Sequence, residues 1–105
     1  HDDDLWEKDF LAKLVPPLEE NPELIVTFCC QSVIDEYGRV NEKRTREYNS
    51  DIGRDHLKQQ LYQPFMELAL KDLAIQPASS AVIRRDAIDW HAFPGRVGPM
   101  WDVYL

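Results

Sequence analysis

The feature that most constrains the fold is the longest apolar run in the chain, Leu24 to Cys30, read Leu-Ile-Val-Thr-Phe-Cys-Cys. Its β-branched and aromatic residues are typical of a strand. The run is too short for a core helix and shows no polar alternation, so it predicts a central strand buried on both faces.

The only two cysteines, Cys29 and Cys30, end this run and are adjacent. Neighbouring side chains on a strand point to opposite faces, so these thiols are not expected to bond to each other. Their spacing also matches no zinc motif. We therefore expect two buried, unreactive thiols in a reducing compartment, which favours a cytoplasmic protein.

A first helix is predicted before the run, with Asp4 as its N-cap. Pro16 and Pro17 should stop or kink it near Leu14. Its apolar residues follow helical spacing and are expected on one face: Leu5, Trp6, Phe10, Leu11, Leu14, Val15 and Leu18.

After the central strand, Asp35-Glu36-Tyr37-Gly38 has the chemistry of a turn. The charged segment 39–48 should then return as an exposed edge strand, with a helix as the alternative there. A second, longer helix is predicted from a cap at residues 49–51 to about Ala74, because apolar residues recur at helical intervals over 57–68. Pro64 lies inside it and should kink it or break it into two helices.

The last third of the chain is expected to contain two strands. Residues 81–93 favour a strand, with a short helix as the alternative, and residues 100–105 favour a closing strand. The fold class is therefore α+β: a small antiparallel sheet with two main helices packed on one face, in the order α-β-β-α-β-β. At 105 residues the chain predicts a single globular domain over 1–105, and no apolar stretch approaches the length of a membrane span.

The formal net charge of −7 is unevenly distributed. Residues 2–23 carry eight acids against two lysines, whereas residues 39–58 carry six cations against four acids. This acidity disfavours nucleic acid as a partner and favours a protein with a basic surface. The predicted partner-binding residues are Glu7, Asp9, Glu19, Glu20 and, as an exposed aromatic near the end of the chain, Trp101.

Catalytic residue types are densest at Asp86, Asp89 and His91. On a strand, Asp89 and His91 would share a face and Asp86 would point to the other, which makes a poor site. We therefore predict no catalytic residues, no metal and no cofactor.

The sequence favours a non-enzymatic, acidic protein-binding module. Its most concrete form is an inhibitor or immunity-type protein that covers a basic partner such as a nuclease toxin. One alternative is a small hydrolase or metal-dependent nuclease that uses Asp86, Asp89 and His91. Another is a subunit of a larger assembly, joined through an edge strand.

Overall fold

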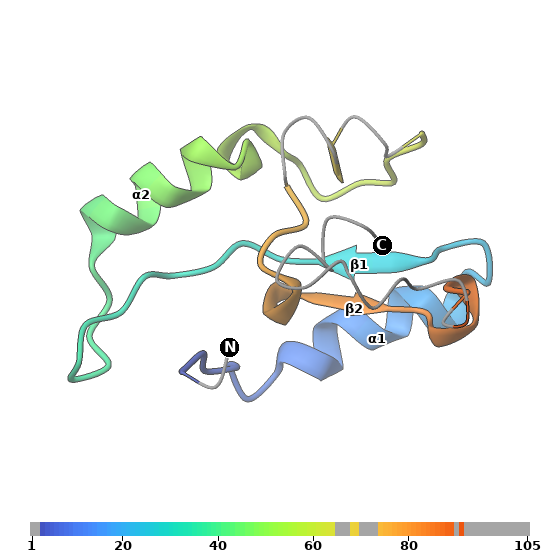
Figure 1. Cartoon of the computed structure of the whole chain (residues 1–105), viewed down its shortest axis with the longest axis horizontal. Coiled ribbons are helices and arrows are strands. Elements are labelled where there is room, and N and C mark those ends of the chain that lie inside the picture. The colour runs from blue at the N-terminus through green and yellow to red at the C-terminus, as the bar shows by residue number, and fades with distance from the viewer. Residues whose placement is uncertain (1–2, 65–67, 70–73, 90, 92–105) are drawn as a thin grey trace. The chain divides into compact units, whose positions relative to one another are not determined.

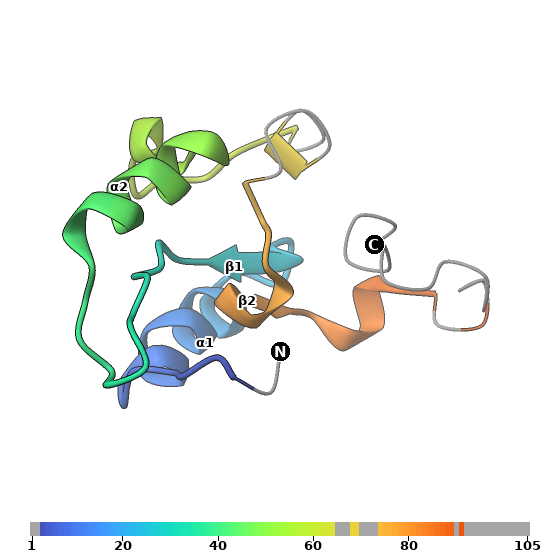
Figure 2. The same ribbon diagram turned by 60° about the vertical axis from the view of Figure 1, so that its left-hand side comes forward.

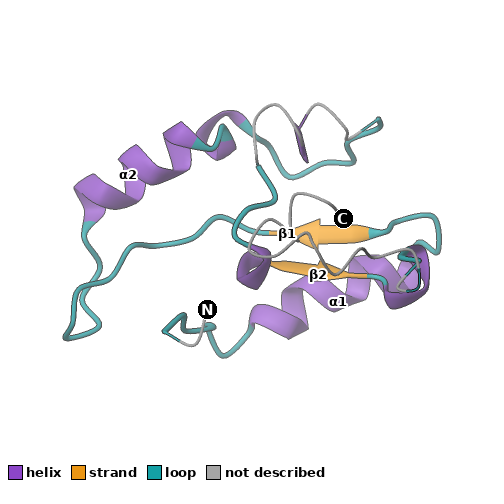
Figure 3. Ribbon diagram, in the orientation of Figure 1, coloured by secondary structure: helices purple, strands orange, loops and turns teal. Residues whose placement is uncertain are grey.

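The fold is α+β, as the sequence predicts, and its described residues include two longer α-helices and a two-stranded antiparallel sheet (Figure 1; Figure 3). This computed structural model describes residues 3–64, 68–69, 74–89 and 91. The elements are α1 (Phe10–Glu20), β1 (Val26–Phe28), α2 (Glu42–Asp51) and β2 (Ala81–Ile83), with 3-10 helices η1 (Arg54–His56), η2 (Ala78–Ser80) and η3 (Arg85–Ala87). The predicted strand over 100–105 lies outside the described residues.

The chain groups into two compact units. The first comprises residues 1–29 and 76–105, and the second comprises residues 30–75. The prediction of one domain over residues 1–105 stays a prediction. No helix among the described residues is long and apolar enough to cross a membrane.

In the first unit, α1 contacts both strands of the sheet (Figure 2). In the sheet, Val26 pairs with Ile83, and Phe28 pairs with Ala81. The predicted central strand is thus reduced to three half-buried residues, and the expectation of burial on both faces is wrong. A buried central strand needs a neighbour at each edge, whereas within the described part of the chain β1 has one neighbour, β2.

Helix α1 buries Phe10, Leu14 and Leu18, which recur every fourth residue and form one stripe. The helix continues to Glu20 through Pro16 and Pro17, so it does not stop near Leu14; the alternative of a kink at the prolines stays a prediction. Each proline removes one N–H donor, and the two carbonyls left without a donor belong to exposed residues, where water can bind them. Burial of the apolar stripe then outweighs the local preference to end the helix.

Helix α2 begins where the sequence predicts an edge strand. The turn over residues 35–38 is present, with Gly38 at φ 76°, but the pairing after it is a single bridge between Ile34 and Val40. Asn41 caps the helix, since its side chain accepts a hydrogen bond from the Arg44 amide at 3.0 Å. Few apolar residues support α2, so this cap and the salt bridges between residues four apart stabilise it.

The longer second helix predicted from residues 49–51 is wrong over its first half. Helix α2 has already ended at Asp51, η1 follows, and residues 57–64 are irregular. Leu61 is 61% exposed, so the apolar spacing that suggested a helix does not mark a buried face here. The predicted strand over 81–93 is likewise short, because β2 ends at Ile83 and η3 follows.

Candidate functional sites

Trp6 is an exposed aromatic side chain that the first unit holds in one orientation. Its indole Nε1 donates to the Ser79 carbonyl at 2.8 Å. Its ring stacks on buried Phe10, with 4.9 Å between ring centroids and 12° between planes. Trp6 nevertheless remains 60% exposed. The side chain is therefore ordered before any partner arrives, which lowers the entropic cost of using it in binding.

Two apolar residues lie near Trp6 in the sequence and are also exposed. Leu5 is 78% exposed and Leu11 is 51% exposed. The sequence predicts all three in the apolar face of a helix, but α1 begins only at Phe10, so Leu5 and Trp6 precede it and helical spacing does not apply to them. We call Leu5, Trp6, Glu7 and Leu11 the N-terminal surface.

The four acids predicted to bind a partner are all exposed. Asp9 differs from the others because its carboxylate lies 2.6 Å from the Lys13 ammonium. The hydrogen bond from Lys13 holds the pKa of Asp9 below its ordinary value. Among the described residues, Glu7, Glu19 and Glu20 form no ion pair. These three, rather than Asp9, keep an uncompensated charge for a partner.

Glu19 and Glu20 end α1, where the helix dipole disfavours negative charge. The last turn of α1 contains no basic residue of its own. Arg84, which directly follows β2, supplies the cation instead: its guanidinium donates to the carbonyls of Leu18 and, at 2.9 Å, Leu24. A residue distant in sequence thus binds carbonyls at the end of α1, while the carboxylates of Glu19 and Glu20 stay without an ion pair among the described residues.

The other predicted site residues are not brought into a catalytic arrangement. Trp101 lies outside the described residues. Asp86 is in η3, and the Asp89 carboxylate accepts a hydrogen bond from the backbone amide of His91 at 3.0 Å. The strand geometry expected for this cluster is wrong, because the sheet ends before it. Within the part of the chain that the structure describes, no three histidine, cysteine or acidic residues are placed to hold a metal ion.

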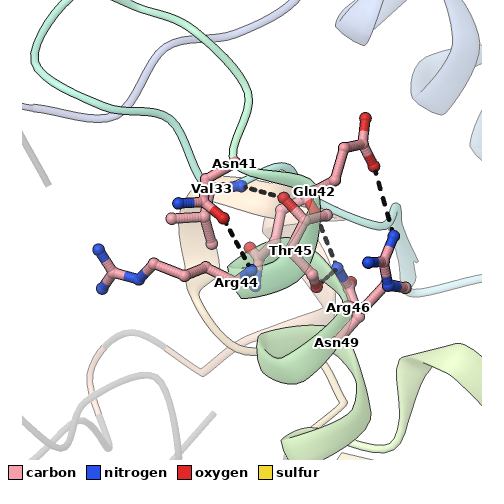
Figure 4. A network of polar contacts seen from close by, with 8 residues as sticks. Val33, Asn41, Glu42, Arg44, Thr45, Arg46 and Asn49 are labelled. Atoms are coloured by element: carbon pink, nitrogen blue, oxygen red, sulfur yellow. Dashed lines mark hydrogen bonds and ion pairs between the residues drawn. The ribbon is translucent and has the colours of Figure 1, made fainter.

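In the second unit, a polar network joins the segment after β1 to one face of α2 (Figure 4). The Val33 amide donates to the Thr45 hydroxyl at 2.9 Å. The side-chain nitrogen of Asn49 donates to the carbonyls of Gln31 and Thr45, both at 2.8 Å. Thr45 and Asn49 lie four residues apart and therefore share a face of the helix.

Beside this network lies an open cavity of about 380 Å³. Its lining includes Cys30, Gln31, Thr45, Arg46, Asn49 and Asp55. Neither cysteine forms a disulfide, but Cys30 is exposed and Cys29 is only half-buried, so the expectation of two buried thiols is wrong. The cause is that β1 ends at Phe28, two residues before the apolar run does.

Sequence reasoning missed both Trp6 and this cavity. The sequence places Trp6 on the apolar face of the predicted first helix, and nothing in it indicates that Ser79 accepts its hydrogen bond. The chain matches no protein-family model, no curated protein and no solved structure.

Proposed function

We propose that this chain is a non-enzymatic protein-binding module whose N-terminal surface contacts a partner with a basic surface. The observation that carries the proposal is Trp6, an exposed tryptophan held by one hydrogen bond and one ring stack. Tryptophan is enriched among the residues that dominate binding energy at protein interfaces. An inhibitor or immunity-type protein that covers a basic enzyme, such as a nuclease toxin, is the most concrete form, and we place it in the cytoplasm.

The charges support a basic partner. Glu7 belongs to the N-terminal surface, and Glu19 and Glu20 are exposed at the C-terminal end of α1. Acids at a helix C-terminus reduce the stability of an isolated helix, so their presence there favours a role other than folding. Such charges would speed the encounter with a cationic protein, and salt would weaken this effect.

The test begins with capture of the partner from cells that produce the protein, followed by association and dissociation kinetics. Leu5→Ser should raise the dissociation rate, because Leu5 is an exposed member of the N-terminal surface. Leu61→Ser is the matched control, since Leu61 is a similarly exposed leucine of the second unit. Trp6→Phe keeps an aromatic ring at this position but removes the Nε1 donor that fixes its orientation, so the change in affinity measures how much that hydrogen bond contributes to binding.

A second pair of variants tests the acids. The double variant Glu19→Gln, Glu20→Gln should lower the association rate and reduce its dependence on salt. The double variant Glu36→Gln, Asp51→Asn removes the same charge from exposed residues of the second unit and should change the rate less. Equal effects of the two double variants, together with equal effects of Leu5→Ser and Leu61→Ser, would show that the partner binds elsewhere.

A further inference from the structure

The cavity in the second unit contains chemistry that protein binding at the N-terminal surface does not use. The exposed thiol of Cys30 lies in its lining. Its volume of about 380 Å³ is within the range of small-molecule sites, roughly 300–1,000 Å³. An exposed thiol alone is not a site, so the other groups of the lining decide what the cavity can bind.

Asn49 provides the first indication of a ligand. Only 8% of this residue is exposed, yet its Oδ1 has no hydrogen-bond partner. The amide cannot turn over to find one, because its nitrogen donates to two carbonyls at 2.8 Å and a turned amide would place its oxygen against both. A buried acceptor without a donor is rare and costly in a folded protein.

Gln31 shows the complementary deficiency. Its buried Nε2 donor has no acceptor, and Gln31 lines the same cavity as Asn49. A peptide amide carries one N–H donor and one carbonyl acceptor, which is what these two side chains together lack. Since both atoms are buried, the long side chains of the lining must adjust when a ligand reaches them.

The charges of the lining are of both signs. Arg46 contributes a guanidinium whose nearest carboxylate, that of Glu42, is 4.0 Å away. Asp55 contributes a carboxylate that lies 3.4 Å from His56, a charged contact only when the imidazole is protonated. A guanidinium and a carboxylate at one cavity favour a zwitterion, which has a carboxylate for Arg46 and an ammonium for Asp55.

We propose that Cys30 is a site of thiol–disulfide exchange with a zwitterionic peptide disulfide that binds in this cavity. The Cys30 thiolate attacks one sulfur of the ligand's disulfide, and a mixed disulfide forms as the original S–S bond breaks. The other half of the ligand leaves as a thiolate and takes up the proton that Cys30 released. The ligand's disulfide is the oxidant, so no other redox partner is required. This proposal does not depend on the proposed function.

Cys29 is not expected to react in the same way. It is half-buried in the first unit, and its Sγ contacts the Ser80 carbonyl at 3.6 Å. Exchange should therefore add one ligand half per chain, and peptide mapping should place it on Cys30. Cys30→Ser should abolish the rapid addition, whereas Cys29→Ser should leave it unchanged.

The experiment compares two probes on the full chain by mass spectrometry: oxidised glutathione, a zwitterionic peptide disulfide, and bis(2-hydroxyethyl) disulfide, which is neutral. Because both rates belong to the same thiol, their ratio cancels any change in its thiolate fraction. The ratio of the two rates in urea-unfolded protein gives the preference of the Cys30 thiol for oxidised glutathione when no cavity is present. We expect the folded chain to favour oxidised glutathione about tenfold more than the unfolded chain does, a factor that about 1.4 kcal/mol of recognition produces.

Arg46→Gln should lower this ratio about threefold, the effect of one exposed charge pair. Arg44→Gln is the matched control, because Arg44 is an exposed arginine of the same helix that is not part of the cavity lining. Asp55→Asn should lower the rate with cystamine, a disulfide that carries ammonium groups, relative to the neutral probe. Equal ratios in folded and unfolded protein, equal effects of Arg46→Gln and Arg44→Gln, or preferential addition at Cys29 would each overturn the proposal.

Discussion

Arg84 should be among the most important single residues for the stability of the first unit, although it belongs to no apolar pattern. Its half-buried side chain donates to the carbonyls of Leu18 and Leu24, and more distantly to that of Asn21 at 3.4 Å. These groups end α1 and lead into β1, so one guanidinium joins the end of the helix to the sheet. We predict that Arg84→Met, which keeps an apolar side chain but removes every donor, will strongly destabilise the fold.

The magnitude follows from the contacts. A hydrogen bond to a charged group contributes about 1.5–3 kcal/mol net. Two such bonds, to the carbonyls of Leu18 and Leu24, are counted here, and the one at 3.4 Å adds little. After allowance for partial exposure, we expect the free energy of unfolding to fall by about 3 kcal/mol. Domains of this kind have a total stability of about 5–15 kcal/mol, so the loss is a substantial fraction.

Equilibrium unfolding in urea, followed by circular dichroism, measures this change. With an m-value of about 2 kcal/mol/M, the midpoint should move down by about 1.5 M urea. Arg84→Lys should recover only part of the loss, because an ammonium lacks the fork of donors that reaches separate carbonyls. Lys8→Met is the control: Lys8 is an exposed cation of the same unit, and its replacement should cost about 0.5 kcal/mol or less. Equal losses from Arg84→Met and Lys8→Met would refute the assigned role.

Three further predictions concern the turn and helix of the second unit. The Asp35 carboxylate accepts hydrogen bonds from the backbone and side chain of Arg39, and these bonds lower the pKa of Asp35. The ionised carboxylate should therefore stabilise the turn fully above about pH 4, and this stabilisation should be lost as the pH falls through the lowered pKa. A carbon-13 NMR titration of the carboxyl group should give a midpoint below the ordinary value, and a midpoint at or above it would contradict the assignment. Gly38→Ala should lower the free energy of unfolding in urea by about 1 kcal/mol, because Gly38 has φ 76°, which a residue with a Cβ adopts only with strain. The loss should not be larger, since an added Cβ would meet no atom within 4 Å. Asn41→Ala should lower stability by about 1 kcal/mol through loss of the cap of α2, and unchanged helicity and stability would show that the cap contributes nothing.

Local patterns predicted the features that depend on neighbouring residues. The spacing of Phe10, Leu14 and Leu18 predicted an amphipathic helix, and these three residues are the buried stripe of α1. The composition of residues 35–38 predicted a turn, and the turn is present. The α+β class followed from an apolar run between amphipathic segments. Each of these features rests on interactions within a few residues, which the sequence displays directly.

Some sequence patterns were ambiguous because competing interactions are similar in strength. Residues 39–48 suit an edge strand and a polar helix almost equally, and the choice depends on one cap and a few weak ion pairs. The local effect of proline alone predicts an end of α1 near Leu14, whereas burial of Leu18 favours its continuation to Glu20. In both segments the sequence is ambiguous because several free-energy contributions of about 1 kcal/mol nearly cancel.

The sequence by itself determined the acidic charge, the apolar stripe of the first helix, the turn at Gly38 and the α+β class. Only the tertiary structure decided that Arg84 would cap α1, that Ser79 would fix Trp6, and that Asn49 would lie beside Cys30 in a cavity. In the first two cases the partners lie 66 and 73 residues apart in the chain. Composition and periodicity describe one segment at a time, whereas these contacts form between segments that only folding brings together.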